Sequence, residues 1–471
     1  MGVNTSKDLS DKPVVLVVGG GYAGVAIARS LETRFNVVVI DRKGYFFHNI
    51  AALRPVAEPD YEKFICIPYD KVFKRASIIK GDVTTITPTH VRLHGHDEDL
   101  RFDYLVISTG TSYAFPAKVP FDRAADVQGL YRNLRGYLYS DQCHEILIVG
   151  GGPVGVELAG EIATNHHGYS KLLPNAEPTA IPQSAASSST STSPSGAAAP
   201  KHITLIHSAA GLVSSRPDLS PKLAQSLQDQ LHRLGVNLVL GEKLDFSSIE
   251  ADSSDAAENT LNCRCVVGHR TVRTSTGREI ETDMIFFCNG ARVNSSSYSE
   301  AFAHVCGEHG DLRVNAHLQV EGYSNIFAIG DCSDADRKMG YLAGLQAEVA
   351  AQNIIRLSKK QTLKSYARSA PVMLVPIGRN GGASQLPFFG VVGKTTTSMI
   401  KGNKLFVDRY WEMMGYSSPP KEFIHHHYTE SIEEHDKRKN LAAALGCPKD
   451  QVVAILHHLP SRKLGPDAEH L

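Results

Sequence analysis

Two glycine-rich segments with the same spacing constrain this chain more than any other feature of its sequence. Both read G-x-G-x-x-G, the first at 19–24 and the second at 150–155, and each lies between an apolar β-branched run and a helix-like stretch. In such a turn the first glycine allows a sharp bend, the second lets backbone approach a pyrophosphate, and the third lets helix and strand pack closely. The pattern predicts two Rossmann-type dinucleotide-binding folds, with these glycines as cofactor-binding residues: Gly19, Gly21, Gly24, Gly150, Gly152 and Gly155.

The residue that ends the next strand differs between the two predicted folds. Asp41 follows the run 37–40, 17 residues beyond Gly24, near the position at which an acid accepts from a ribose hydroxyl. In the second fold the run 203–206 is followed by His207. Histidine neither favours NAD as an acid does nor holds the 2′-phosphate of NADP as a base does. We predict that kcat/KM for NADH and NADPH differs by less than about 100-fold. The alternatives are an ordinary glycine turn for the first segment and a solvent-exposed strand cap for His207.

Three further glycines follow apolar strand-like runs, and two of them, Gly110 and Gly290, are predicted cofactor-binding residues. Gly110 follows 105–107, Gly290 follows 285–287, and Gly330 precedes Asp331 after the run 326–329. The short Asp331 side chain is suited to accept from a ribityl or ribose hydroxyl. The alternative role is an N-cap for the following helix, and the two roles are compatible.

Composition limits the classes of protein that remain. The chain has 471 residues, enough for two to four domains, and its 49 basic and 49 acidic residues cancel, which argues against nucleic acid as a partner. Eight scattered cysteines without a C-x-x-C pair predict inert thiols and no metal site. The most apolar run, 13–28, is too short to cross a membrane and does not resemble a signal peptide.

Two segments do not fit a packed fold. Residues 170–200 include a long run of Ser, Thr, Ala, Pro and Gly, which predicts a disordered insertion within the second fold. From residue 417 to 471 the composition differs from that of the preceding folds, with a histidine run at 425–427 and a helical pattern at 439–444. We expect a tail there whose role the sequence leaves open.

Together these residues resemble the two-dinucleotide-domain flavoproteins of the glutathione-reductase type. The resemblance implies an α/β fold in which the second Rossmann-like domain is inserted in the first and a small C-terminal α+β region follows. The implied parts are an N-terminal segment 1–12, an FAD-binding domain 13–117 and 292–365, an NAD(P)H-binding domain 118–291, a C-terminal domain 366–416 and the tail.

One departure from that superfamily bears on the reaction. Its disulfide reductases carry a C-x4-C pair soon after the first acid, whereas residues 46–54 here read F-F-H-N-I-A-A-L-R. Electrons therefore cannot leave a flavin through a protein disulfide at this place, and an external acceptor is expected.

Within that superfamily the chain more closely resembles the ferroptosis suppressor proteins, the apoptosis-inducing-factor-like NAD(P)H:quinone oxidoreductases. The resemblance rests on 46–54, S-T-G-T at 108–111, G-G-G-P-V-G-V-E-L-A-G-E at 150–161, I-T-L-I-H-S at 203–208, 312–332, K-M-G-Y-L-A-G-L at 338–345 and K-L-F-V at 404–407. It implies catalytic roles for Glu157, Lys401 and His48. It also implies cofactor-binding roles for Asp41, Lys43, Arg54, Lys118, Asp331, Lys338, Met339 and His207. The plain alternatives are a helix-dipole acid for Glu157, a core histidine for His48 and a solvated lysine for Lys401.

The same resemblance implies a two-step cycle. NADH or NADPH reduces FAD, and the flavin passes two electrons to a quinone of the ubiquinone or vitamin K type, so that an antioxidant quinol suppresses ferroptosis. The resemblance also allows a homodimer. The alternatives are a respiratory-type single-subunit NADH:quinone dehydrogenase and a DNA-binding signalling flavoprotein. The charged tail and the zero net charge, respectively, count against them.

The amino terminus fits an acylation signal. Residues 1–6, M-G-V-N-T-S, match the pattern for N-myristoylation of Gly2. We therefore expect a cytoplasmic protein attached peripherally to membranes or lipid droplets. A single myristoyl chain binds membranes only marginally, so a second contact would be needed.

Overall fold

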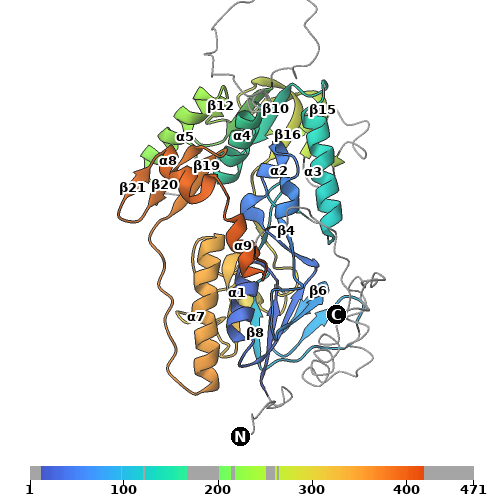
Figure 1. The fold of residues 1–471 in the computed structure, drawn as a ribbon, viewed down its shortest axis with the longest axis vertical. Helices are drawn as coiled ribbons and strands as arrows, with labels where there is room; N and C mark the ends of the chain where they lie inside the picture. The colour runs from blue at the N-terminus through green and yellow to red at the C-terminus, as the bar shows by residue number, and fades with distance from the viewer. Residues whose placement is uncertain are drawn as a thin grey trace, which may run out of the picture.

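The computed structural model describes residues 12–417, except 97, 120–121, 167–200, 214–217, 251–259 and 262–264, together with residue 419. The predicted insertion at 170–200, Gly2 and residues 420–471 of the tail lie outside this part. Figure 1 shows two sheets, one above the other, with the C-terminal elements beside the upper one. No helix in the described ranges combines the length and apolarity needed to cross a bilayer.

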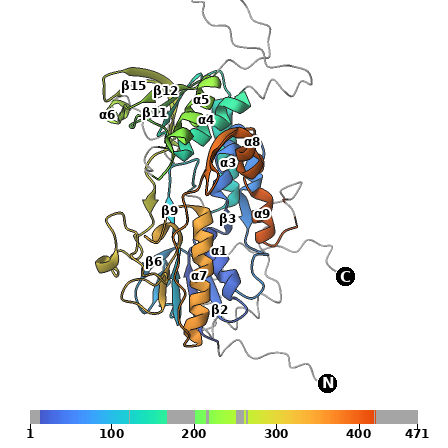
Figure 2. The same ribbon diagram turned by 90° about the vertical axis from the view of Figure 1, so that its left-hand side faces the viewer.

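The first sheet is parallel and carries the first glycine turn. Its order is β18 (Ile326–Ala328), β8 (Tyr104–Ile107), β1 (Val14–Val18), β2 (Asn36–Asp41) and β5 (Ser77–Lys80). In the register Val18 lies beside both Ile40 and Ile107, so the strands end together at one edge. Helices α1 (Tyr22–Leu31) and α7 (Gly340–Ser358) pack together against this sheet (Figures 1 and 2). Strands buried along their whole length are typical of a parallel sheet, which confirms the α/β prediction.

The second sheet repeats this arrangement and extends it. Strands β12 (Asn237–Leu240), β11 (His202–His207), β10 (Glu145–Val149) and β16 (Glu279–Phe287) are parallel. Strand β15 (Cys265–Thr274) pairs antiparallel with β16, and β13 (Leu244–Asp245) and β14 (Thr260–Leu261) pair antiparallel with β15. The flanking helices are α3 (Ala124–Leu138), α4 (Pro153–His166), α5 (Pro221–Arg233) and α6 (Ser247–Glu250).

The C-terminal elements touch both sheets' helices. They are β19 (Met373–Ile377), β20 (Gly381–Leu386), β21 (Gly390–Val392), α8 (Lys394–Thr397), the π-helical turn η7 (Ser398–Gly402) and α9 (Val407–Met413). Strand β19 packs on α4 so closely that a Cβ on Gly160 would lie 2.7 Å from Ile377 Cα. At the other end, Trp411 of α9 donates from Nε1 to Phe64 O at 3.0 Å. The C-terminal elements therefore join the two folds.

Short elements complete the first fold around the sheet edge. They are β3 (Tyr45–Phe47), η2 (Asn49–Ala51), α2 (Arg54–Ala57), β4 (Cys66–Pro68), β6 (Val83–Ile86), β7 (Val91–Leu93), β9 (Thr111–Ser112), β17 (Arg292–Val293) and η6 (Gly330–Cys332).

Candidate functional site

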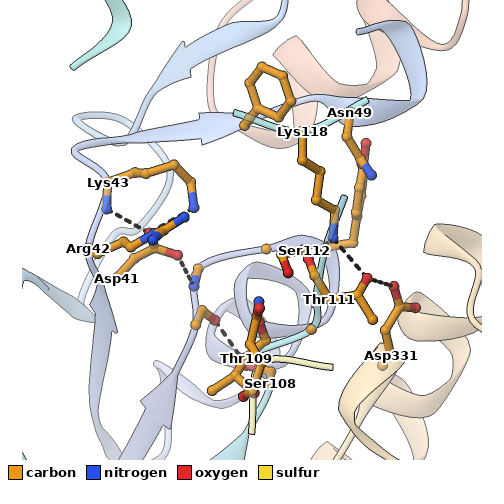
Figure 3. Close-up of a pocket in the computed structure, with 18 of the residues that line it drawn as sticks. Asp41, Arg42, Lys43, Asn49, Ser108, Thr109, Thr111, Ser112, Lys118 and Asp331 are labelled. Atoms are coloured by element: carbon orange, nitrogen blue, oxygen red, sulfur yellow. Dashed lines mark hydrogen bonds and ion pairs between the residues drawn. The ribbon is translucent and has the colours of Figure 1, made fainter. Parts of the chain in front are cut away.

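A cavity of about 580 Å³ lies at the carboxyl ends of the first sheet's strands. That volume is in the range of small-molecule and cofactor sites, and this sheet edge is where ligands of α/β folds bind. The lining comes from the glycine turn, the ends of β2 and β8, η2, η6, and the segments around 113–119 and 290–297. Figure 3 shows its polar residues.

The glycine turn forms the floor of this cavity. Gly19 has φ +105°, a conformation that L side chains rarely adopt. A Cβ on Gly24 would lie 1.8 Å from Gly19 O, so only glycine lets α1 pack this close to the turn. A Cβ on Gly21 would meet nothing within 4 Å, because its backbone faces the open cavity. The free N–H groups at the start of α1 can therefore receive a pyrophosphate.

Asp41 lies at one end of the cavity with its carboxylate held in place. Its Oδ2 accepts from Gly20 N at 2.6 Å and its Oδ1 accepts from Lys43 N at 2.8 Å (Figure 3). Lys43 Nζ lies 3.3 Å from Oδ1. The backbone N–H donors orient the carboxylate, and Asp41 and Lys43 both line the cavity.

A second polar group lies at the other end, around Thr111. Its Oγ1 donates to Asp331 Oδ2 at 2.7 Å, and Lys118 Nζ donates to Thr111 Oγ1 at 3.0 Å and to Thr111 O (Figure 3). Burial lowers the pKa of Lys118 to about 8, so the side chain is still mainly protonated at neutral pH. Thr111 was not among the predicted site residues. The signal that could have found it is its position directly after the strand-end Gly110.

The cavity fits FAD by its own chemistry. Asn49 Oδ1 is buried at its wall without a hydrogen-bond partner in the described part of the protein, as expected of a group whose partner is a ligand. Cβ atoms on Gly110 and Gly290 would meet nothing within 4 Å, so backbone is exposed to the cavity on that side as well. A helix start, a fixed carboxylate and two lysines match a pyrophosphate with flanking hydroxyl-bearing groups.

The second glycine turn has the same geometry in the second fold. Gly150 has φ +118°, and a Cβ on Gly155 would lie 1.9 Å from Gly150 O. The His207 ring lies against Gly151, where a Cβ would be 2.7 Å from it. His207 Nε2 is buried without a partner among the described residues, and burial lowers the pKa of His207. A neutral imidazole beside an open glycine turn fits NAD(P)H.

Two ion pairs one helical turn apart connect α4 to the other parts of the chain. Lys401 of η7 donates from Nζ to Glu157 Oε1 at 2.7 Å and to Leu374 O at 3.2 Å. Burial raises the pKa of Glu157, an effect that the Lys401 ammonium opposes. The second pair joins Arg54 to Glu161 at 2.9 Å, with both side chains buried. Arg54 also donates to Gly402 O at 2.6 Å and Asn403 O at 2.8 Å, which fixes the end of η7.

His48 is a fully buried link between the cavity wall and the C-terminal elements. Its Nε2 lies 2.8 Å from Leu405 O, so this nitrogen carries the proton and donates. Its Nδ1 then accepts from the hydroxyl of Tyr22, a cavity residue, at 2.9 Å. Burial lowers the pKa of His48 to about 4, so the ring is neutral at physiological pH.

We expect stability to fall as the pH drops from about 7 towards 4, because of His48. The unfolded histidine takes a proton below its ordinary pKa of 6.5, whereas the native ring stays neutral down to about 4. The loss is about 3 kcal/mol and stops below the native pKa. Urea unfolding of the wild type and of His48→Gln, followed by fluorescence of the single tryptophan, measures it. The wild type should lose more stability with falling pH than the variant, and parallel curves would contradict the prediction.

The structure gathers some predicted site residues around the cavity and leaves others apart. Lining it are Gly19, Gly21, Asp41, Lys43, Gly110, Lys118, Gly290 and Asp331. In the first fold but outside its lining lie Gly24, His48, Arg54, Lys338 and Met339, with Lys338 Nζ donating to Asp331 O at 2.8 Å. Glu157 and Lys401 meet at the junction with the C-terminal elements. Within the described ranges no three His, Cys, Asp or Glu side chains gather as a metal site.

Comparisons with known proteins agree with this geometry. The family model described as pyridine nucleotide-disulphide oxidoreductase matches residues 13–355. Apoptosis-inducing factor homolog B of Dictyostelium discoideum is 33% identical over 87% of this chain and 99% of its own. Ferroptosis suppressor protein 1 of Homo sapiens is 34% identical over 86% of this chain and 96% of its own. These relatives confirm the resemblance predicted from the motifs.

Solved structures share the fold at low sequence identity. The sulfide:quinone oxidoreductase of Aquifex aeolicus matches with a TM-score of 0.64 at 16% identity, over 87% of this chain and 93% of that one. NDH2 of Plasmodium falciparum, solved in complex with NADH, matches with a TM-score of 0.59 at 12% identity, over 88% of this chain and all of that one. At such identities the likeness establishes the arrangement of the two folds.

Proposed function

We propose that this chain, a member of the pyridine nucleotide-disulphide oxidoreductase family, reduces a quinone of the ubiquinone or vitamin K type. As a member of that family it is a flavin-dependent oxidoreductase that uses FAD and NAD(P)H. The product would be an antioxidant quinol, which fits the ferroptosis-suppressor name of its relatives. The identity of the quinone, the roles of the site residues and the limits of the predicted domains are parts of this proposal.

The observation that carries it is a flavin-sized cavity without a cysteine among its described lining residues. Residues 46–54 contribute Phe47, Asn49 and Ile50 to the wall where a disulfide reductase would carry its cysteine pair. Electrons must therefore leave for a diffusible acceptor. When bound, FAD supplies the two-electron chemistry between NAD(P)H and that acceptor.

The protein residues have assignable tasks around that chemistry. Asp41 and the start of α1 hold the adenosine and pyrophosphate part, and Lys118 adds a positive charge at the opposite end. The ion pair between Glu157 and Lys401 places a carboxylate and an ammonium together in a largely buried position. Two of the three Lys401 donors are used by Glu157 and Leu374, so Nζ can still offer a proton or a hydrogen bond to a substrate oxygen.

Replacing Glu157 with glutamine tests this assignment. We expect stopped-flow reduction of the flavin by NADH to slow at least about tenfold, because the buried charge that orients Lys401 is lost. Flavin content should stay at the wild-type level, and Glu279→Gln, on an exposed strand end, should behave as wild type. Unchanged flavin reduction in Glu157→Gln would remove this residue from the site. A wild-type protein that oxidises NADH without reducing a short-chain quinone would refute the proposed function.

A further inference from the structure

Four large apolar side chains are exposed on the C-terminal elements. Phe388, Phe389 and Met399 are 104%, 78% and 80% exposed. Ile400, which follows Met399 in the chain, is 38% exposed. The other exposed large apolar residues of the described chain, Phe246 and Tyr341, are single side chains on other elements. Isolated exposed apolar residues are normal, but several on one small unit indicate an interaction surface.

The two phenylalanines occupy the loop of a tight hairpin. Leu386 of β20 pairs with Gly390 of β21, so Pro387, Phe388 and Phe389 form a three-residue loop. Phe388 has φ +66°, a left-handed conformation that suits glycine and is rare for a bulky residue. Backbone strain of this kind persists where the position has a task. Here the strained backbone holds an aromatic side chain out at the tip of the hairpin.

The surrounding segment carries only positive charge. Residues 369–407 contain no Asp or Glu, although about one residue in ten of the whole chain is acidic. The same segment contains Arg379, Lys394, Lys401 and Lys404. Three of these pair with carboxylates elsewhere, whereas Lys394, directly after the hairpin, is exposed and makes no ion pair with the described residues. A segment that exposes aromatic and aliphatic side chains and contributes no carboxylates of its own suits a lipid headgroup layer.

The hairpin and η7 form one unit that includes the Lys401 site. Ser384 of β20 and Thr397 share a buried hydrogen bond of 2.7 Å between their hydroxyls, which fixes β20 against α8 and η7. Met399 and Ile400 directly precede Lys401, whose Nζ meets Glu157. Figure 1 shows β20, β21 and α8 together at the left edge of the molecule. Met399 and Ile400 are therefore continuous in the chain with the proposed reaction site, and the hairpin that carries the two phenylalanines packs on the same elements.

We propose that Phe388, Phe389, Met399 and Ile400 form a docking surface for a phospholipid membrane. It provides the second contact that a single acyl chain would need, and it turns the side of the protein bearing Lys401 towards the lipid phase. The delivery of an apolar quinone through this surface rests on the proposed function. The membrane contact itself depends only on the exposed residues.

Vesicle flotation of the full-length, FAD-loaded protein tests the surface. The protein is made in bacteria, so that Gly2 carries no acyl chain, and is mixed with vesicles of phosphatidylcholine and phosphatidylserine. The double variant Phe388→Ser/Phe389→Ser should partition at least about tenfold less than the wild type. The matched control is Phe246→Ser, which removes an exposed phenylalanine next to β13, at the far edge of the second sheet, and should float like the wild type.

Activity separates docking from catalysis. The double variant should reduce a water-soluble short-chain quinone at the wild-type rate and a long-chain quinone held in vesicles at least about fivefold more slowly. Equal flotation of the double variant and the wild type would overturn the proposal. Loss of self-association by light scattering, with flotation unchanged, would likewise overturn it and indicate a second copy of the chain as the occupant. Failure of the wild type to reduce any quinone would refute the proposed function while leaving the flotation result standing.

Discussion

Replacing Gly24 with valine is expected to yield a protein that retains less than about a tenth of the wild-type flavin. A Cβ at this position would lie 1.8 Å from Gly19 O, a contact with rigid backbone that no rotamer change can relieve. Helix α1 must then move away from the turn, and its N–H groups leave the place where a pyrophosphate is held. The ratio of flavin to protein absorbance in the purified variant, with and without added FAD, measures the effect.

The matched variant is Gly155→Val in the second turn. Its Cβ would lie 1.9 Å from Gly150 O, so the steric clash is nearly the same as at Gly24. We expect this protein to keep its flavin and to lose at least about tenfold in kcat/KM for NADH. Equal flavin loss in both variants would show that the two turns do not have separate cofactors.

Removing the buried guanidinium of Arg54 is expected to cost about 3–5 kcal/mol of stability. In Arg54→Met the Glu161 carboxylate keeps its burial but loses its partner, and the carbonyls of Gly402 and Asn403 lose their donor. The urea midpoint should fall strongly when followed by fluorescence of Trp411, the only tryptophan, which sits in α9 close behind these carbonyls in the chain.

A second substitution tests whether the unpaired charge is the cause. Arg54→Met/Glu161→Gln should recover part of the lost stability, because the buried carboxylate is gone. Arg135 of α3 offers a matched control, since it forms a similar buried pair with Glu62 at 2.8 Å and lies away from η7. Arg135→Met should destabilise the protein without slowing flavin reduction, whereas Arg54→Met should do both because Arg54 also fixes η7 and Lys401. A double variant as unstable as Arg54→Met would contradict the charge explanation.

Much of the fold could be predicted because its determinants are local. Gly19 and Gly150 adopt positive φ angles, and a Cβ on Gly24 or Gly155 would collide with the backbone five residues earlier. Each turn therefore requires glycine at these positions, which makes it recognisable in the sequence. The strands covered on both faces read as continuous apolar runs, and Asp41 closes β2 as expected. The antiparallel extension β13–β15 escaped prediction because β13 and β14 have only two residues each, and because buried and exposed residues alternate irregularly along the ten-residue β15.

The candidate site likewise contains features that local sequence determines and features that depend on long-range packing. By itself the sequence determined two dinucleotide turns, the acid at the end of β2 and the missing cysteine pair, since these depend on residues within one turn or one strand. Only the tertiary structure decided that Glu157 meets Lys401, 244 positions away, that Arg54 meets Glu161, 107 positions away, and that His48 meets Leu405, 357 positions away. A buried charge or imidazole needs some partner, but the identity of that partner depends on which helices the packing brings together. The two glycine fingerprints therefore predicted the two dinucleotide-binding folds, and the contact between α4 and η7 decided which side chains meet between them.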